Sequence, residues 1–347
     1  MSKVMIIGAG LGGLYAGNLL AARGHRVKIF ESHSAPGGYT AGFRRKGFYF
    51  ESGTLSFESS GMVFKAMREI GIFDQLNFVP QMSRWVSQDF DIGTESYESF
   101  KETICRAFPA DRETLTQYFA ALDKMYYSTL VFIKSESMSL SSFFAYMING
   151  LKMLGLFRQY SGVTLGQFTE RFFAKGSRLY RLFGQIGYPE MAAYIVGGAM
   201  ATIFDDYWTV KDGMQSWADV LAGNFRSLGG ELQLNSRVNR IVTENGKAVG
   251  VTCNGETEKG DYVISAGDYK KTFLKLLDDR SLLPKDFLQK VEAAQVSEGV
   301  ATVYLGLSIS NDRLREYLKT PILPQLLSIP WTRCAKNPHR DCKSYLR

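Results

Sequence analysis

Strand-like and helix-like patterns alternate at the start of the chain. Residues 3–7 and 26–31 are short, mainly apolar runs that predict two strands, and the second run ends at Glu31. The segment between them has apolar residues at helical spacing, namely Leu14, Ala16, Leu19 and Leu20. A strand, a helix and a second strand in this order predict a parallel βαβ unit, and therefore an α/β fold of Rossmann-like type.

A second group of strands is expected in the last third of the chain. Residues 237–243 and 247–253 are strand-like, and the Asn245-Gly246 pair between them is typical of a tight hairpin turn. Residues 261–268 begin with a further apolar run. We therefore expect a β-meander inserted before a strand that returns to the parallel sheet.

The middle of the chain, residues 75–204, has helical periodicity and little strand alternation. We expect this region to form a largely helical α+β second domain, to which residues 301–307 add a strand. The expected breaks between its helices are Pro109, Gly150, Gly155, Gly162 and Gly166.

Residues 143–157 are the most apolar segment of this middle region. Lys152 interrupts the segment, and it is shorter than the roughly 20 residues that span a bilayer. Two interpretations remain open: a buried helix that lines an apolar tunnel, or a helix that also enters a membrane interface. In the second case, nearby basic residues would meet anionic headgroups, and these are Arg158, Arg171, Lys175, Arg178 and Arg181.

A glycine-rich turn follows the first predicted strand and opens the predicted helix. Its glycines are Gly8, Gly10, Gly12 and Gly13. Glycine at the first position permits a tight turn, at the second lets backbone approach a phosphate, and at the last lets the helix pack closely on the strand. Glu31 lies where a carboxylate binds the ribose of an adenosine and would repel a 2′-phosphate. The pattern predicts a dinucleotide site that disfavours NADP.

Composition and charge narrow the functional classes. A chain of 347 residues with 45% hydrophobic content can form a large core divided over two domains. The formal net charge is +7, of which residues 331–347 supply +4, so the remaining chain is nearly balanced. No nucleic-acid-binding motif accompanies this charge, and we expect no nucleic-acid partner.

The cysteines and the N-terminus indicate a cytoplasmic protein. Cys105, Cys253, Cys334 and Cys342 form no CxxC pair, and the N-terminus enters a strand without a cleavable signal. Cys334, His339 and Cys342 are three metal-ligand types without a fourth, so no metal site is expected.

Further motifs follow Glu31. Pro36-Gly37-Gly38-Tyr39-Thr40 precedes the Gly-aromatic-x-aromatic-acid-x-Gly segment at 47–53. In these residues, and in residues 207–221, 229–241 and 261–268, the chain resembles the phytoene desaturase, carotenoid isomerase and retinol saturase branch of the FAD-dependent, amine-oxidase-like flavoproteins. Many desaturases of this branch have Arg where this chain has Tyr39. This difference favours a resemblance to the isomerases and saturases over one to the desaturases.

The resemblance implies FAD as cofactor and assigns roles to several residues. It implies that Gly37 and Gly38, with Tyr39 beside them, bring backbone near the pyrophosphate and flavin, and that the backbone of Val238 meets the adenine. It also implies an FAD-binding domain of residues 1–74 and 205–285, a substrate domain of residues 75–204 and 286–330, and a basic tail at 331–347. The family closes its FAD site with a C-terminal segment that this chain lacks, so we expect a truncated product or a complementing second chain.

The expected activity follows from the same resemblance. FAD would exchange a hydride with an apolar polyene or isoprenoid, in a cytoplasmic protein that contacts a membrane peripherally. Two alternatives stay open: an amine oxidase-type flavoenzyme, and a truncated, non-catalytic nucleotide- or isoprenoid-binding remnant. No acid or base is assigned, because each candidate could equally cap a helix or face water; the candidates are Glu51, Tyr188, Glu190, Asp205 and Asp206.

Overall fold

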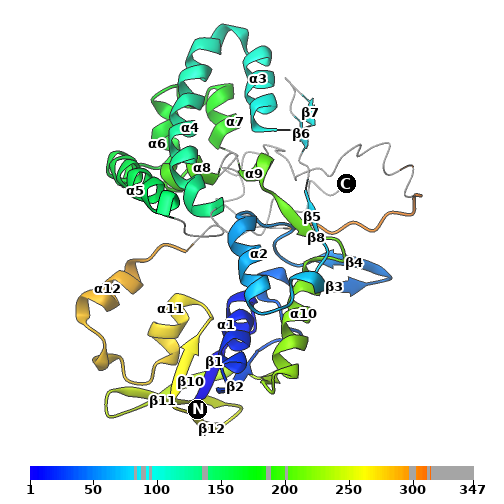
Figure 1. The fold of residues 1–347 in the computed structure, drawn as a ribbon, viewed down its shortest axis with the longest axis vertical. Coiled ribbons are helices and arrows are strands. Elements are labelled where there is room, and N and C mark those ends of the chain that lie inside the picture. Colours follow the sequence, from blue (N-terminus) through cyan, green and yellow to red (C-terminus); the bar gives the residue numbers. More distant parts are fainter. Residues whose placement is uncertain are drawn as a thin grey trace, which may run out of the picture. The chain divides into compact units, whose positions relative to one another are not determined.

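The computed structural model contains an α/β unit and a largely helical unit (Figure 1). It describes residues 1–81, 84–86, 91–93, 96–134, 140–184, 189–199, 202–296, 302–310 and 313. Unit 1 consists mainly of Met1–Gln81 and Tyr207–Ser308, and unit 2 mainly of Met82–Phe132 and Ser137–Asp206. The α/β fold class expected from the sequence is confirmed.

A four-stranded parallel sheet is the centre of unit 1. Its strand order is β13 (Tyr262–Ser265), β1 (Lys3–Ile7), β2 (Arg26–Phe30) and β9 (Glu231–Gln233). Both faces of β1 are covered, which explains its continuous apolar sequence. Val4 and Ile6 pack in the cluster that includes α1 and α10, whereas Met5 packs with the β-meander on the other face.

Two helices cover one face of this sheet. They are α1 (Leu11–Ala22) and α10 (Met214–Ser227), which contact each other. Leu14 of α1 and Phe225 of α10 are completely buried, together with Ile29 of the sheet. The predicted βαβ unit of residues 3–31 is therefore confirmed.

The β-meander is also present as expected. It consists of the antiparallel strands β10 (Val238–Glu244), β11 (Lys247–Cys253) and β12 (Glu256–Lys259). The turn residues Asn245 and Gly246 have φ angles of 51° and 76°, the left-handed values that a tight hairpin of this kind requires.

The remaining elements of unit 1 are short. They are the hairpin β3 (Gly42–Arg45) and β4 (Phe48–Glu51), the strand pair β5 (Phe78–Pro80) and β8 (Trp208–Val210), the helices α2 (Ser60–Glu69), α11 (Tyr269–Lys271) and α12 (Lys285–Ala293), and the single turns η1 (Gly38–Thr40), η2 (Phe73–Gln75), η4 (Thr272–Leu276) and η5 (Arg280–Leu282).

The prediction of a strand at residues 301–307 is wrong for those of its residues that the structure describes. Residues 302–308 form no strand, and they belong to unit 1. Val303 and Leu305 are largely exposed, while the ring of Tyr304 packs edge-on against Phe43 of β3. A strand needs a hydrogen-bonded neighbour, and aromatic side-chain packing supplies none. The sequence also predicted that the FAD-binding domain ends at residue 285. In the structure unit 1 continues beyond this residue, because α12 packs on η4 and both belong to unit 1.

Unit 2 is built from helices around an aromatic core. The helices are α3 (Tyr97–Ala107), α4 (Arg112–Lys134), α5 (Leu140–Tyr160), α6 (Leu165–Glu170), α7 (Arg178–Gly184), α8 (Ala193–Ala199) and α9 (Thr202–Asp205), with the turn η3 (Pro109–Asp111) and the hairpin β6 (Arg84–Val86) and β7 (Asp91–Gly93). Tyr118 of α4 lies at its centre, with its ring centroid 4.4 Å from that of Phe183.

The helix boundaries of unit 2 follow only some of the expected breaks. Pro109 separates α3 from α4, and Gly162 follows the end of α5. Gly150 and Gly155 lie inside α5, so the expected breaks there are wrong. Glycine costs about 1 kcal/mol in a helix interior but keeps its N–H group, whereas proline loses it.

Candidate functional site

Two glycines of the turn after β1 are required by the fold itself. Gly8 has a φ of 101°, and its N–H donates to the carbonyl of Phe30 at 2.8 Å. A Cβ on Gly13 would overlap the carbonyl oxygen of Gly8. These glycines let α1 begin directly against the end of β1, as the sequence pattern predicts.

Gly10 and Gly12 have a different environment. Apart from chain neighbours and the backbone of α1 itself, a Cβ on either residue would meet no protein atom within 4 Å. Gly10 is the N-cap of α1 in an ordinary extended conformation with φ of −71°, and neither a side-chain cap nor an acidic residue occupies the first turn. Packing does not explain glycine here, and the uncapped helix end favours an anion, so the turn is suited to a phosphate group.

Glu31 is a buried carboxylate beside this turn. It is 6% exposed, its Oε2 accepts from the Ala9 N–H at 2.8 Å, and its Oε1 accepts from the His33 N–H at 2.9 Å. These bonds fix the carboxylate next to Gly10. The Ser32 hydroxyl also donates to Oε1 at 3.2 Å. A carboxylate offers about four acceptor positions, so capacity for a ligand hydroxyl remains.

The Gly37-Gly38 pair lies against the same turn. The Gly37 N–H donates to the carbonyl of Ala9 at 2.8 Å, and Gly37 forms a parallel bridge with Gly10. Gly37 and Gly38 have φ of 129° and 58°, and a Cβ on Gly38 would lie 3.2 Å from the Cα of Gly10. Tyr39 is different, because its side chain is 87% exposed.

Val238 begins β10 close to the end of β2. It is buried, and the preceding Ser236 N–H donates to the carbonyl of Glu31 at 2.6 Å. The Asn235 N–H donates to the carbonyl of His33 at 2.9 Å. These bonds bring the segment before Val238 to the residues after β2, although about 200 residues separate them in sequence.

Gln215 is a residue that the sequence interpretation missed. Its side-chain amide lies between Pro36 and Gly42, the two ends of the Gly37-Gly38 loop. The available signal was its position within residues 207–221, one of the segments that carry the family resemblance. Only the tertiary fold indicates what its amide contacts.

Glu51 caps a helix, one of the two roles considered for it. Its Oε1 accepts from the Met214 N–H at 2.7 Å, and the Tyr49 hydroxyl donates to its Oε2 at 2.9 Å. Burial raises the pKa of Glu51 above its usual value, against the lowering effect of these two hydrogen bonds. Burial also raises the pKa of Tyr49 to about 12, and the hydrogen bond to Glu51 adds to this effect.

The other acid and base candidates belong to unit 2 or lie outside the described residues. Asp205 accepts from the Tyr97 N–H at 3.2 Å, at the start of α3. Asp206 is buried, Glu190 is exposed, and Tyr188 lies outside the described residues. We assign none of these residues to proton transfer.

The three residues considered as metal ligands, which include two of the four cysteines, lie outside the described part of the chain. Cys334, His339 and Cys342, and the whole segment 331–347, lie outside the described residues. Cys105 and Cys253 are buried free thiols, and burial raises the pKa of Cys105. Within the described ranges, His, Cys, Asp and Glu side chains form no group of three suited to a metal.

A parallel sheet, a glycine turn at a helix N-terminus and a buried acid after the second strand together define a dinucleotide-binding protein. The chain belongs to the flavin-containing amine oxidoreductase family, whose model matches residues 11–318. This membership supports FAD as the cofactor, as expected from the sequence, and the glycine turn and Glu31 fit a dinucleotide.

Similar characterised proteins are carotenoid desaturases and isomerases. The chain is 28% identical to a 4,4′-diapophytoene desaturase of Methylomonas sp. over 88% of this chain and 61% of that protein. It is 24% identical to the prolycopene isomerase of Daucus carota, over 81% of this chain and 48% of that protein. The chain thus spans about half to three-fifths of the length of these relatives.

Solved structures share the fold. An oxidoreductase from Methanosarcina mazei matches with a TM-score of 0.51 and 20% identity, over 84% of this chain and 65% of that chain. Putrescine oxidase bound to putrescine matches with a TM-score of 0.57 and 17% identity, over 84% and 63%. At these identities the likeness concerns architecture alone.

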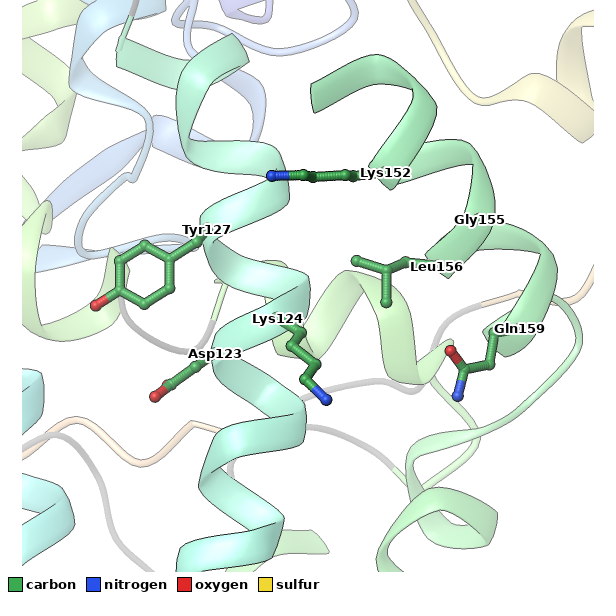
Figure 2. Close-up of a pocket in the computed structure, with 7 residues that line it drawn as sticks. All are labelled: Asp123, Lys124, Tyr127, Lys152, Gly155, Leu156 and Gln159. Carbon is green, nitrogen blue, oxygen red and sulfur yellow. The ribbon is translucent and has the colours of Figure 1, made fainter. Parts of the chain in front are cut away.

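Unit 2 contains a cleft between α4 and α5 (Figure 2). Its volume is about 580 Å³, and Lys152 and Leu156 extend from α5 toward α4. The lining combines charged, polar and apolar side chains, namely Asp123, Lys124, Tyr127, Lys152, Gly155, Leu156 and Gln159. The apolar tunnel considered for residues 143–157 stays a prediction.

The described C-terminal turns of α5 place apolar side chains at the surface of unit 2. Met153 and Leu156 pack on the aromatic core. Four other apolar side chains are 49–69% exposed, namely Ile148, Leu151, Leu154 and Phe157.

Three of the five basic residues named for the membrane interpretation make contacts within unit 2. Lys175 pairs with Glu170 at 3.3 Å, Arg171 lies over the ring of Tyr160, and Arg181 donates to the carbonyl of Gly176.

No helix in the described ranges is both long enough and apolar enough to cross a membrane.

Proposed function

We propose that unit 1 holds FAD at the turn between β1 and α1. In this proposal, the backbone at Gly8, Gly10, Gly12 and Gly13 faces the pyrophosphate, and Glu31 accepts hydrogen bonds from the adenosine ribose. Val238 lies at the adenine, while Gly37, Gly38 and Tyr39 face the flavin side of the pyrophosphate. The main support is the space over Gly10 beside an uncapped helix end, with a buried carboxylate fixed next to it.

We propose further that the protein is an FAD-dependent oxidoreductase that acts on an apolar polyene or isoprenoid. The observation that carries this proposal is the match to proteins named diapophytoene desaturase and prolycopene isomerase. FAD, when bound, supplies hydride acceptance or donation. The chain's own residues bind the cofactor and orient it, and unit 2 is taken as the substrate domain.

The amine-oxidase alternative has less support. Putrescine oxidase shares the architecture at 17% identity, and a likeness at this level carries fold and not chemistry. The relatives at 24–28% identity are named for carotenoid substrates.

The first experiment is the visible absorption spectrum of the purified chain, mixed with FAD and measured before and after desalting. We expect flavin bands to remain after desalting. Anaerobic addition of 4,4′-diapophytoene in detergent should then bleach the bands, because hydride transfer reduces the flavin. A folded sample that loses all its flavin would contradict the cofactor site, and retained flavin that no polyene bleaches or reoxidises would favour the non-catalytic alternative.

We also propose that α5 contacts an anionic membrane surface, from which an apolar substrate would enter. The helix has no acidic residue, Lys152 and Arg158 give it two positive charges, and its exposed apolar side chains lie among them. Apolar insertion together with attraction to anionic headgroups holds such helices at an interface.

The double variant Leu151→Ser/Leu154→Ser tests this contact. We expect it to bind vesicles containing phosphatidylglycerol about tenfold more weakly than the unmodified chain, because two apolar side chains no longer insert. The matched control is Leu228→Ser/Leu282→Ser, which changes two leucines of unit 1 that are 40% and 41% exposed. Co-sedimentation with vesicles measures both, and equal binding by both double variants would refute the role of α5.

A further inference from the structure

The loop that carries Gly37 and Gly38 is closed by one side chain from α10. Gln215 Oε1 accepts from the Gly42 N–H at 3.0 Å, and its Nε2 donates to the carbonyl of Pro36 at 3.1 Å. Gly42 can only donate here and Pro36 can only accept, so the orientation of the amide is determined by its partners. Gln215 thus binds both ends of the loop at once.

The amide of Gln215 is itself held in place. Its Nε2 also donates to Asp219 Oδ1 at 2.8 Å, one turn further along α10. The start of α10 is fixed by Glu51, which accepts from the Met214 N–H, and by Gly213, whose φ of 90° and close approach to the Tyr49 ring leave no space for a Cβ. The side chain therefore extends toward the loop from the first turn of α10, where the Met214 N–H is bonded to Glu51.

The turn η1 inside this loop also packs against α10, and further hydrogen bonds hold the loop. Within the loop, the Thr40 N–H and hydroxyl both bond the carbonyl of Gly37, and on the other side the Gly37 N–H bonds the carbonyl of Ala9. Pro36 and Gly37 are buried, so a lost partner there is not simply replaced by water. The loop is thus held on one side by the Gly37 bond to Ala9 and its bridge to Gly10, and at its two ends by Gln215.

We propose that Gln215 is a positioning residue for the cofactor: it holds residues 36–42 so that the Gly37-Gly38 backbone stays against Gly10, at the edge of the FAD site. This inference rests on the proposed FAD site in unit 1. Gln215 acts through the loop and does not need to touch the cofactor.

The test compares Gln215→Leu and Gln215→Glu with Gln289→Leu, an exposed glutamine of α12. Leucine removes both bonds to the loop. Glutamate keeps an acceptor for the Gly42 N–H, loses the donor to Pro36 and adds a charge beside Asp219. We expect both Gln215 variants to bind FAD about tenfold more weakly, measured by quenching of flavin fluorescence, and Gln289→Leu to bind it normally.

Hydrogen exchange of the apoprotein separates positioning from general stability. We expect faster exchange of the amides of residues 37–42 in Gln215→Leu, with the β1 and β2 amides unchanged. Wild-type FAD affinity in both Gln215 variants, or an equal acceleration of exchange throughout unit 1, would overturn the proposal. If the unmodified chain binds no FAD, the proposed cofactor site fails, and the exchange of the Gly42 amide alone decides whether Gln215 holds the loop.

Discussion

At the scale of single residues, the four glycines of the turn after β1 have two separate causes. Gly8 and Gly13 are required by backbone geometry and by the close packing of α1 on β1. Gly10 and Gly12 have ordinary space around them, so the protein alone would tolerate a methyl group at either position. Stability measurements and ligand-binding measurements should therefore respond to different members of the same motif.

The first prediction compares Gly10→Ala with Gly13→Ala. Gly10→Ala should change the melting temperature of the apoprotein little but weaken FAD binding at least tenfold, because the methyl group would occupy the space of a phosphate. Gly13→Ala should cost about 1–3 kcal/mol of unfolding free energy, since the new Cβ overlaps the Gly8 carbonyl. Circular dichroism melts and flavin fluorescence quenching measure the two effects, and equal loss of stability in both variants would contradict the distinction.

The second prediction concerns Glu31. Glu31→Gln should weaken FAD binding about 10- to 100-fold, because charge-assisted hydrogen bonds of roughly 1.5–3 kcal/mol to the ribose become neutral ones. Titration of the apoprotein with FAD measures the affinity, and Glu256→Gln, an exposed glutamate of β12, is the control. Equal affinity in Glu31→Gln and the control would exclude the ribose role.

At the scale of elements, Asp278 connects the β-meander to the segment after η4. Its Oδ1 accepts from the Thr243 hydroxyl at 2.5 Å, and its Oδ2 accepts from Arg240 Nη2 at 2.9 Å. Burial alone would raise the pKa of Asp278, but the hydrogen bonds from Thr243 and the Arg240 guanidinium outweigh burial and lower it below 3.8. Arg240 is 59% exposed, so Thr243 provides the stronger part of the stabilisation.

The third prediction follows from the sign of this shift. A lowered pKa in the folded state means that Asp278 stabilises the fold above about pH 4, and that this contribution is lost as the pH falls through the folded-state pKa. Asp278→Asn should reduce the unfolding free energy by about 1–3 kcal/mol at pH 7 and reduce its slope below pH 4. Urea denaturation at a series of pH values measures both, with the exposed Asp74→Asn as control. An unchanged slope in Asp278→Asn would show that another carboxylate is responsible.

At the scale of the whole molecule, ligand binding should distinguish the two units. The proposed FAD contacts all lie in unit 1, while unit 2 has its own aromatic core around Tyr118. A ligand that binds only the folded form stabilises that form by about 2.7 kcal/mol when its concentration is 100 times its dissociation constant.

The fourth prediction is that FAD slows hydrogen exchange in β1, β2 and the loop at residues 36–42. Exchange in the part of α4 around Tyr118 should stay unchanged. Mass spectrometry of exchanged peptides with and without FAD measures this. Equal protection in both units would mean that they unfold as one cooperative body.

The sequence by itself determined the local features of this protein. The apolar run of β1, the turn at Gly8 and the hairpin at Asn245-Gly246 follow from strand patterning and from glycine's access to positive φ, both of which depend on near neighbours in the chain. Only the tertiary structure decided that α5 continues through Gly150 and Gly155, that residues 302–308 find no strand partner, and that Gln215 binds both ends of the loop at 36–42. These outcomes depend on packing and hydrogen bonds between residues far apart in sequence, and hydrophobic periodicity does not encode the partners of a single polar side chain.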